Sequence, residues 1–480
     1  MTTSELEALI AQSIQDFKNK VDWEDSGKIV AIYDGIVRVS GLYSVFFNEV
    51  VIFSNDMAGI VISLEKDSLL VAVLGNYRLL KADTIVLRTH QQAHVKASEE
   101  LLTRILDGCG NPIDKGGPII NGQLMPIDND AMPMMHRSAV NRQLVTGIRC
   151  IDWLLPIGFG QRQAILGGRG AGKTSIITDI IISQKDVKNT ISIYVSIGQR
   201  INNARNVQAL LEENGVKNYI IINSLSSDPA PSRYLAPFTA MAIAEYFMQQ
   251  GKNAIVYFDS LTQHAFAYRE MSLIMRRAPG REAYPGDIFY QHAKLLERAA
   301  KAHENFGGGS ITAFPVVETI YDDISYIATN IMSITDGQIF LKNELAALNI
   351  RPAINIKISV SRIGGAVQLP ILKKKISCMK ADIARGQEYA EICGLSQEVD
   401  DQTYKIVEKG KFFEKLLLQK KNTPMKMWHQ ILLLHLAVNG LIAIDDIEKA
   451  ILMTASYGEY EDEILKGNLQ VIDNITKEII

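Results

Sequence analysis

The stretch QAILGGRGAGKTSIITDIIISQK occupies residues 163–185 and contains GGRGAGKT at 167–174. This octapeptide matches the pattern G-x-x-x-x-G-K-[ST], in which glycines let successive backbone N–H groups surround phosphate oxygens. The apolar run before it is typical of a strand. The run after it is typical of a helix, whose N-terminus adds positive potential at the same point. We therefore predict a phosphate-binding loop between a strand and a helix of an α/β domain.

Each residue type in this loop has a defined task toward a nucleoside triphosphate. Lys173 would neutralise the β- and γ-phosphates, and the Thr174 hydroxyl would ligate Mg²⁺. A partner carboxylate is expected at the end of a neighbouring apolar strand, and NAIVYFD ends in Asp259, which would hold the metal through water. The sequence thus predicts a site for ATP or ADP with Mg²⁺ at Thr174 and Asp259. Its loop residues are Gly167, Gly168, Arg169, Gly170, Ala171, Gly172, Lys173 and Thr174.

Binding a nucleotide differs from hydrolysing it, because hydrolysis needs a group that orients and polarises the attacking water. A carboxylate near a strand end is the usual choice, but the predicted strand at 193–197 runs into Gly198-Gln199-Arg200. The Gln199 amide can hydrogen-bond water but cannot take its proton at pH 7. If Gln199 faces the γ-phosphate, the missing carboxylate would cost on the order of 10²–10⁴ in rate. Otherwise Gln199 is simply a polar residue at a strand end.

The first two segments differ in periodicity from the rest of the chain. Residues 1–20 begin with a capping box at Ser4 and Glu7 and continue as an amphipathic helix, which either packs on its own domain or docks a partner. Residues 21–92 show short β-branched runs broken by turns, including a hairpin signal at Asp-Gly 34–35. We predict a small closed β-barrel there.

Apolar strands alternate with helical stretches over residues 93–368, which predicts a mostly parallel sheet covered by helices. Residues 369–480 contain few glycines and show helical periodicity, so they predict a helical domain. The candidate strands of the central domain are Gln163–Leu166, Ile191–Ile197, Tyr219–Asn223, Ala254–Asp259 and Ser310–Val317.

Composition excludes several classes of protein. Lys and Arg total 50 against 53 for Asp and Glu, a net charge of −3, whereas dedicated nucleic-acid binders show a marked basic excess. Hydrophobic residues at 47% and charged residues at 21% exclude general disorder. The most apolar run, Gln430 to Ile444, is short and predicts a buried helix. Without a signal pattern we expect a cytosolic chain, and the cysteines form no CxxC pair and indicate a reducing compartment: Cys109, Cys150, Cys378 and Cys393.

Four long segments resemble the α subunit of F-type ATP synthase. They are SDPAPSRYLAPFTAMAIAEYF from residue 227, YREMSLIMRRAPGREAYPGDIFYQHAKLLERAAK from 268, ATNIMSITDGQIFL from 328 and RPAINIKISVSRIGGAVQ from 351. The likeness covers essentially the whole chain. It implies a multi-domain fold with an N-terminal β-barrel, a central RecA-like nucleotide-binding domain and a C-terminal α-helical bundle.

The resemblance also implies partners and a location. Three α chains would assemble with three catalytic β chains around a rotating γ stalk, and the helix at 1–20 would dock the δ subunit. The membrane F0 sector would be an indirect partner, and no nucleic acid is implied. The chain would then be a peripheral membrane protein on the cytoplasmic face of a bacterial inner membrane, in a proton-translocating enzyme.

Site roles follow from the resemblance at three places. The family's β subunit has a catalytic glutamate in a GER motif where the α subunit, like this chain, has Gln, so Gln199 implies binding without turnover. The SVSR run places Ser359 and Arg362 on the α-subunit motif whose arginine reaches the neighbouring β chain's catalytic site. Gln419 corresponds to the first Gln of a QxQ motif near the adenine.

The chain also departs from the family pattern. The usual loop reads GDRQTGKT, so Gly168, Gly170 and Ala171 replace Asp, Gln and Thr, which changes the expected affinity. After Gln419, the second Gln of QxQ is replaced by Lys421, and a deletion is expected near 445–455. These differences suggest a divergent version or a second, alternative set of the enzyme.

Two other classes remain as alternatives. A self-sufficient hexameric ATPase, such as a flagellar or type III export motor, would need a carboxylate where Gln199 stands. A ring-shaped RNA translocase like Rho shares the central fold but needs a barrel with basic and aromatic residues clustered for RNA. The first 95 residues show no such basic excess.

Overall fold

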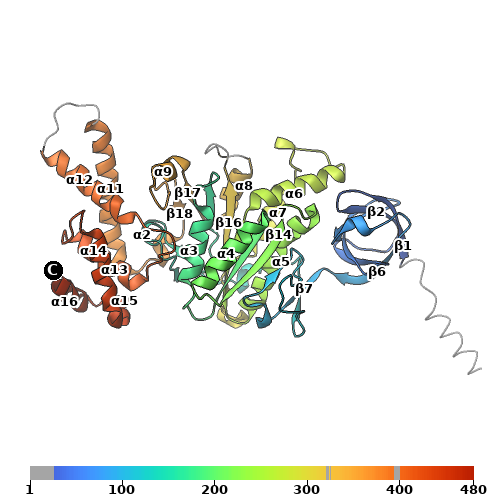
Figure 1. Cartoon of the computed structure of the whole chain (residues 1–480), viewed down its shortest axis with the longest axis horizontal. Helices are drawn as coiled ribbons and strands as arrows, with labels where there is room; N and C mark the ends of the chain where they lie inside the picture. Colours follow the sequence, from blue (N-terminus) through green and yellow to red (C-terminus); the bar gives the residue numbers. More distant parts are fainter. Residues whose placement is uncertain (1–25, 320–323, 325, 394–400, 480) are drawn as a thin grey trace, which may run out of the picture.

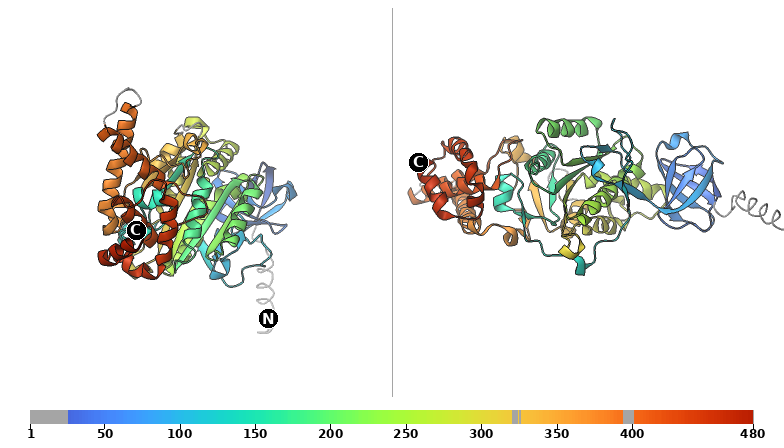
Figure 2. Two further views of the ribbon diagram at one scale, coloured as in Figure 1. Left: turned by 60° about the vertical axis from the view of Figure 1, so that its left-hand side comes forward. Right: turned by 90° about the horizontal axis from the view of Figure 1, so that it is seen from below.

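The computed structural model describes residues 26–319, 324, 326–393 and 401–479. The predicted amphipathic helix at 1–20 lies outside these described residues. Figure 1 and Figure 2 show an elongated chain in which a β-barrel and a helical domain lie at opposite ends of a central α/β domain. The three predicted domain types are therefore confirmed, in the predicted order.

The barrel closes in the order β1-β2-β5-β4-β3-β6. Its β-branched residues alternate inward, so that Val37, Val39, Val51, Val71 and Val86 form a common buried core. Gly35 has φ +77° in the turn between β1 and β2, which confirms the Asp-Gly hairpin. The strands are β1 (Ser26–Ile32), β2 (Ile36–Gly41), β3 (Glu49–Phe53), β4 (Ala58–Leu64), β5 (Leu69–Leu74) and β6 (Ile85–Gln92).

The central domain is built on a sheet of order β18-β17-β12-β16-β15-β13-β14-β8. All neighbouring strands are parallel except the edge pair β17 and β18. All five candidate strands are confirmed, with ends shifted by at most a few residues. The strands are β8 (Ile105–Leu106), β12 (Ala164–Gly167), β13 (Thr190–Gln199), β14 (Tyr219–Leu225), β15 (Asn253–Asp259), β16 (Ser310–Glu318), β17 (Gly337–Leu341) and β18 (Val360–Ser361).

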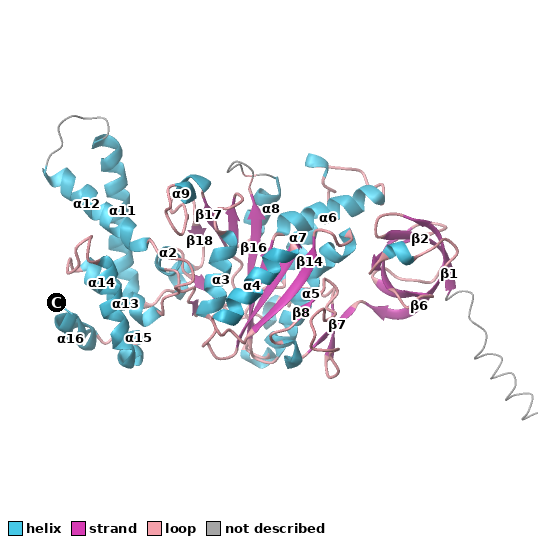
Figure 3. Cartoon of the chain, in the orientation of Figure 1, coloured by secondary structure: helices cyan, strands magenta, loops and turns pink. Residues whose placement is uncertain are grey.

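Helices cover both faces of this sheet, as Figure 3 shows. Along β15, Ile255 and Tyr257 enter the core beneath α3 and α4, whereas Val256 and Phe258 enter the core beneath α5 and α6. Because both faces of the sheet are buried, each strand is a continuous run of hydrophobic residues in the sequence. The main helices are α3 (Lys173–Ser183), α4 (Ile201–Glu213), α5 (Ala230–Gln249), α6 (Leu261–Ile274), α7 (Ile288–Glu297) and α8 (Tyr326–Ile334).

The helical domain shares a core with the α3 face of the central domain, in part through the short buried helix α2 (Arg149–Leu154). Gln430 lies in α13, whose residues are almost all buried, so the predicted buried helix is confirmed and ends at Val438. In the described part of the chain no helix is long and apolar enough to cross a membrane. The helices are α11 (Pro370–Cys393), α12 (Asp401–Leu417), α13 (Met427–Val438), α14 (Ile447–Thr454), α15 (Glu461–Leu465) and α16 (Leu469–Ile479).

Candidate nucleotide-binding site

The predicted phosphate loop runs from the last residue of β12 to the first residue of α3, at the carboxyl edge of the sheet. Gly170 and Gly172 have φ of +79° and +102°, a backbone region that residues with a Cβ rarely adopt. A Cβ at Gly170 would meet open space. A Gln at this position, as in the usual family loop, would therefore have enough space, but its backbone would be strained by the positive φ.

Lys173 lies inside the loop and is only 7% exposed. Its Nζ donates to the carbonyl oxygens of Gly167 at 2.8 Å and Gly168 at 2.7 Å. Burial lowers the pKa of Lys173, while the nearby carboxylates Glu318 and Asp259 act in the opposite direction. Among the described residues, the Lys173 ammonium donates only to neutral carbonyl oxygens. It can exchange these for phosphate oxygens, whose negative charge makes the hydrogen bonds stronger.

The structure brings Thr174 and Asp259 together. The Thr174 hydroxyl donates to Asp259 Oδ2 at 3.1 Å, and the Tyr194 hydroxyl donates to the same oxygen at 2.9 Å. Asp259 is buried, and burial raises the pKa of its carboxyl, although these hydrogen bonds oppose that rise. The hydroxyl and carboxylate oxygens fit Mg²⁺, which binds few protein oxygens and completes its shell with phosphate and water. The described residues contain no cluster of three acidic, His or Cys side chains that could hold a metal alone.

Gln199 ends β13 at the same edge and lines the cleft. Its Nε2 lies 3.4 Å from Asp259 Oδ1, and its Oε1 accepts from Asn203 Nδ2 at 3.1 Å. The amide therefore sits beside the carboxylate expected to hold the metal.

These side chains line a cleft of about 720 Å³, a size that suits a nucleotide. Sequence reasoning missed three of its charged residues, Arg200, Glu318 and Arg351. Glu318 ends β16 and pairs with Arg169 at 3.7 Å, although Arg169 is 85% exposed. Arg351 lies over the loop, with Nη1 3.7 Å from where a Cβ on Gly172 would be. The position of Glu318 at a strand end was an available signal, whereas that of Arg351 depends on the fold.

Gln419 does not line this cleft. Its Nε2 donates to Gly147 O at 2.8 Å and Thr423 O at 2.7 Å, and its Oε1 accepts from the Arg149 N–H at 3.0 Å. Its own N–H donates to Arg351 O at 2.9 Å. Gln419 thus joins the helical domain to the backbone of the residue that covers the loop.

Arg362 and Ser359 lie at the edge strand β18 and do not line the cleft. Arg362 is exposed; its N–H donates to Asp336 O at 2.9 Å and its Nη1 to Thr335 O at 3.3 Å. Ser359 is buried, with Oγ donating to Asn355 O at 2.6 Å and accepting from the Phe340 N–H at 2.9 Å. The serine hydroxyl is therefore engaged within the chain, whereas the Arg362 side chain is exposed to solvent.

Comparison with known proteins accounts for all three domains. The beta-barrel domain model of the ATP synthase alpha/beta family matches residues 23–90, its nucleotide-binding domain model matches 147–361, and its C-terminal domain model matches 368–478. The chain belongs to the ATP synthase alpha/beta family. Its match to the family's three models follows the order of the barrel, sheet and helical domains described above.

The relatives show which subunit type of the ATP synthase alpha/beta family this chain resembles. ATP synthase subunit alpha of Clostridium acetobutylicum is 42% identical over 460 residues, which cover 95% of this chain and 91% of the relative. The subunit alpha of Clostridium botulinum strain Alaska E43 is 41% identical over 450 residues, or 93% and 89% of the two chains. The resemblance to F-type α subunits is thereby confirmed.

Proposed function

We propose that this chain is the regulatory, non-catalytic α subunit of the F1 sector of a proton-translocating ATP synthase. It binds ATP or ADP with Mg²⁺ in the cleft and does not hydrolyse it. The observation that carries this proposal is the Gln199 amide beside Asp259, where hydrolysis needs a group able to take a proton from water. An amide can orient water there but has no basic oxygen at neutral pH.

The other cleft residues would bind different parts of the nucleotide. The loop N–H groups and Lys173 would hold the phosphate chain, with Arg169 and Arg351 adding charge at its rim. Thr174 and Asp259 would position Mg²⁺, which when bound neutralises phosphate charge. Gln419 would act indirectly, by fixing the backbone of Arg351.

Arg362 is proposed to act in the catalytic site of a neighbouring β chain. It is exposed, lies outside its own cleft, and forms no ion pair within the described residues. An always-protonated guanidinium can stabilise the charge that develops on a γ-phosphate in trans. Ser359 would support it by anchoring the preceding loop to β17.

The partners follow from this role. We propose an α₃β₃ hexamer around γ, with δ at the peripheral stalk and the F0 sector as an indirect membrane partner. The complex would be located at the cytoplasmic face of a bacterial inner membrane. The relatives' name, ATP synthase subunit alpha, supports assembly with further subunits.

A self-sufficient hexameric export ATPase is the second candidate, because Glu318 places a carboxylate in the same cleft. If Glu318 could polarise water in place of Gln199, the chain would hydrolyse ATP without a partner. The two candidates therefore differ in one measurable property of the isolated chain.

The test is to measure Mg-ATP binding and turnover on the purified single chain. We expect binding by calorimetry and no turnover above background. Lys173→Ala should weaken binding at least tenfold, because it removes the cation that lies among the loop carbonyls. Lys217→Ala, an exposed lysine outside the cleft, is the matched control. Steady hydrolysis that disappears in Glu318→Gln would instead establish the export-type candidate.

A further inference from the structure

A second pocket of about 650 Å³ lies at the opposite edge of the central sheet. It is formed where the chain enters three parallel strands: residues 188–189 precede β13, 251–253 lead into β15, and 301–304 lie before β16. The nucleotide cleft lies at the carboxyl ends of these strands. Because these strands are parallel, the two pockets are separated by the length of the strands.

We call this the basal pocket; it is lined by Ser138, Ala139, Asn141, Arg142, Phe159, Lys188, Asn189, Gly251, Asn253, Lys301, Ala302, His303, Glu304 and Gly308. Three of these residues are cations and only Glu304 is a carboxylate, which gives a net charge of +2 with His neutral. The nucleotide cleft has four cations and two carboxylates, and so the same net charge.

The cations of the basal pocket are not neutralised by the protein. In the described part of the chain, none of Arg142, Lys188 and Lys301 forms an ion pair with a carboxylate. The Arg142 guanidinium lies 4.1 Å over the ring of the buried Phe159, and the loss of water there lowers the pKa of Arg142. Arg142 and Lys188 are exposed and Lys301 is half-buried, so an anion that entered the pocket could reach all three cations.

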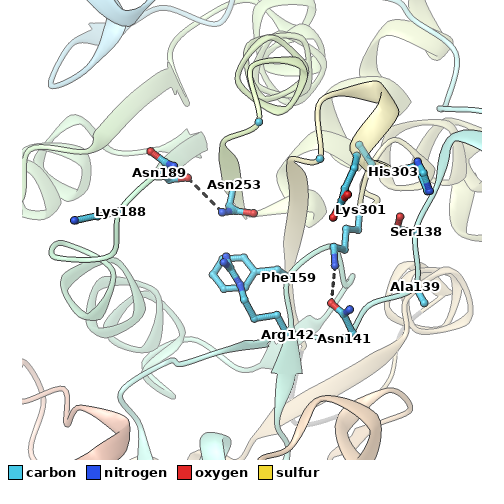
Figure 4. A pocket seen from close by; sticks show the side chains of 14 residues that line it. Ser138, Ala139, Asn141, Arg142, Phe159, Lys188, Asn189, Asn253, Lys301 and His303 are labelled. Carbon is cyan, nitrogen blue, oxygen red and sulfur yellow. Dashed lines mark hydrogen bonds between the residues drawn. The ribbon is translucent and has the colours of Figure 1, made fainter. Parts of the chain in front are cut away.

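A neutral amide holds one of these cations, Lys301, in place. Lys301 Nζ donates to Asn141 Oδ1 at 2.6 Å, and Asn253 Nδ2 lies 3.4 Å from Asn189 O. Figure 4 shows Arg142 and Lys301 on opposite sides of the pocket, with Asn253 above and Asn141 below. Amide oxygens orient an ammonium group without cancelling its charge, and charge-assisted hydrogen bonds to phosphate use such donors.

We propose that the basal pocket binds a small phosphate-bearing anion, either free phosphate groups or the phosphate chain of a nucleotide. Arg142 and Lys301 would contact the phosphate oxygens from two sides, and Lys188 would add charge at the rim. This site is separate from the phosphate loop and does not depend on Lys173.

The experiment measures pyrophosphate and ADP binding to the full-length chain by calorimetry, without Mg²⁺. In a Lys173→Ala background, which disables the loop, we expect one remaining class of site. Adding Arg142→Gln and Lys301→Gln should weaken that binding at least tenfold. Adding Lys217→Gln, which removes a lysine outside both pockets, should leave it unchanged. Tighter binding of ADP than of pyrophosphate would identify a nucleotide as the ligand, and equal binding would identify the phosphate group alone.

Asn141→Asp tests the same pocket with a smaller risk to folding, because Asn141 is exposed. The new carboxylate would pair with Lys301 and repel phosphate, so anion affinity should again fall at least tenfold while thermal stability is kept. The proposal is overturned if Lys173→Ala alone removes all binding. It is equally overturned if, in the Lys173→Ala background, Asn141→Asp binds pyrophosphate as tightly as the Lys173→Ala chain alone.

Discussion

Two histidines lie completely buried against each other between α6 and α7. His264 Nδ1 is 3.2 Å from His292 Nε2, and within the described residues the other ring nitrogens, His264 Nε2 and His292 Nδ1, have no hydrogen-bond partner. Burial lowers the pKa of His264 far below its usual range and lowers the pKa of His292 to about 4. Because burial disfavours the charged form of both rings, the folded chain keeps this pair neutral at pH 7.

This pair should make stability sensitive to acid. Unfolded histidines take up protons below about pH 6.5 and the folded pair does not, so its stabilisation is complete above that pH and is lost as pH falls toward 4. The loss should be about 1.4 kcal/mol per pH unit for each proton. We expect His292→Gln to reduce the pH dependence of the urea unfolding free energy, whereas His94→Gln, at an exposed histidine, should not. Equal pH slopes in both variants would contradict this assignment.

At the scale of elements, two glycines allow the long helices α11 and α12 to touch through their backbones. A Cβ on Gly386 would come within 2.7 Å of the Gly410 Cα, and a Cβ on Gly410 within 2.8 Å of the Gly386 Cα. Beside this crossing, Lys409 Nζ forms an ion pair with Asp382 Oδ2 at 2.9 Å. The close approach depends on the absence of side chains and cannot be relieved by a rotamer change.

Gly410→Ala should therefore destabilise the helical domain, against the usual helix preference. Alanine gains about 1 kcal/mol over glycine within a helix, but overpacking costs about 1–3 kcal/mol, and here the clash is with backbone. We expect a net loss of about 1 kcal/mol and a lower melting temperature. Gly365→Ala is the control, because a Cβ there meets nothing within 4 Å. A Gly410→Ala chain as stable as the parent would show that the helices can separate without cost.

At the scale of the whole molecule, the chain is extended, and its exposed arginine and its nucleotide cleft belong to different parts of the central sheet. The cleft lies at the carboxyl ends of β12, β13 and β15, whereas Arg362 follows the edge strand β18. A residue at the edge of a sheet can reach an adjoining chain more easily than its own central strands. The proposed role of Arg362 therefore exists only in the assembled enzyme.

Arg362→Ala should leave nucleotide binding to the isolated chain nearly unchanged, because Arg362 does not line the cleft. In the assembled α₃β₃γ complex, multisite hydrolysis should fall on the order of 10³-fold, the usual effect of removing an arginine finger. Arg78→Ala, at an exposed position of the barrel, is the control. Retained multisite turnover in Arg362→Ala would remove the finger assignment.

The local features of this protein follow from short stretches of its amino-acid sequence. The glycine pattern at 167–174, the apolar runs of the strands and the helical periodicity after 369 each act over a few residues, so they predicted a loop, a sheet and a helical domain that the structure contains. Asp259 was also found this way, because a carboxylate at a strand end needs only local pattern and the known direction of parallel strands.

Which distant residues meet depends on how the whole chain packs. Glu318 and Arg351 enter the nucleotide cleft because β16 lies next to β12 and because the loop after β17 folds over Gly172, neither of which leaves a local pattern. Gln419 turned away from the cleft to bond backbone atoms of another domain. The basal pocket gathers its cations from several segments far apart in sequence. Such contacts join residues a hundred or more positions apart, and only the packed chain specifies them.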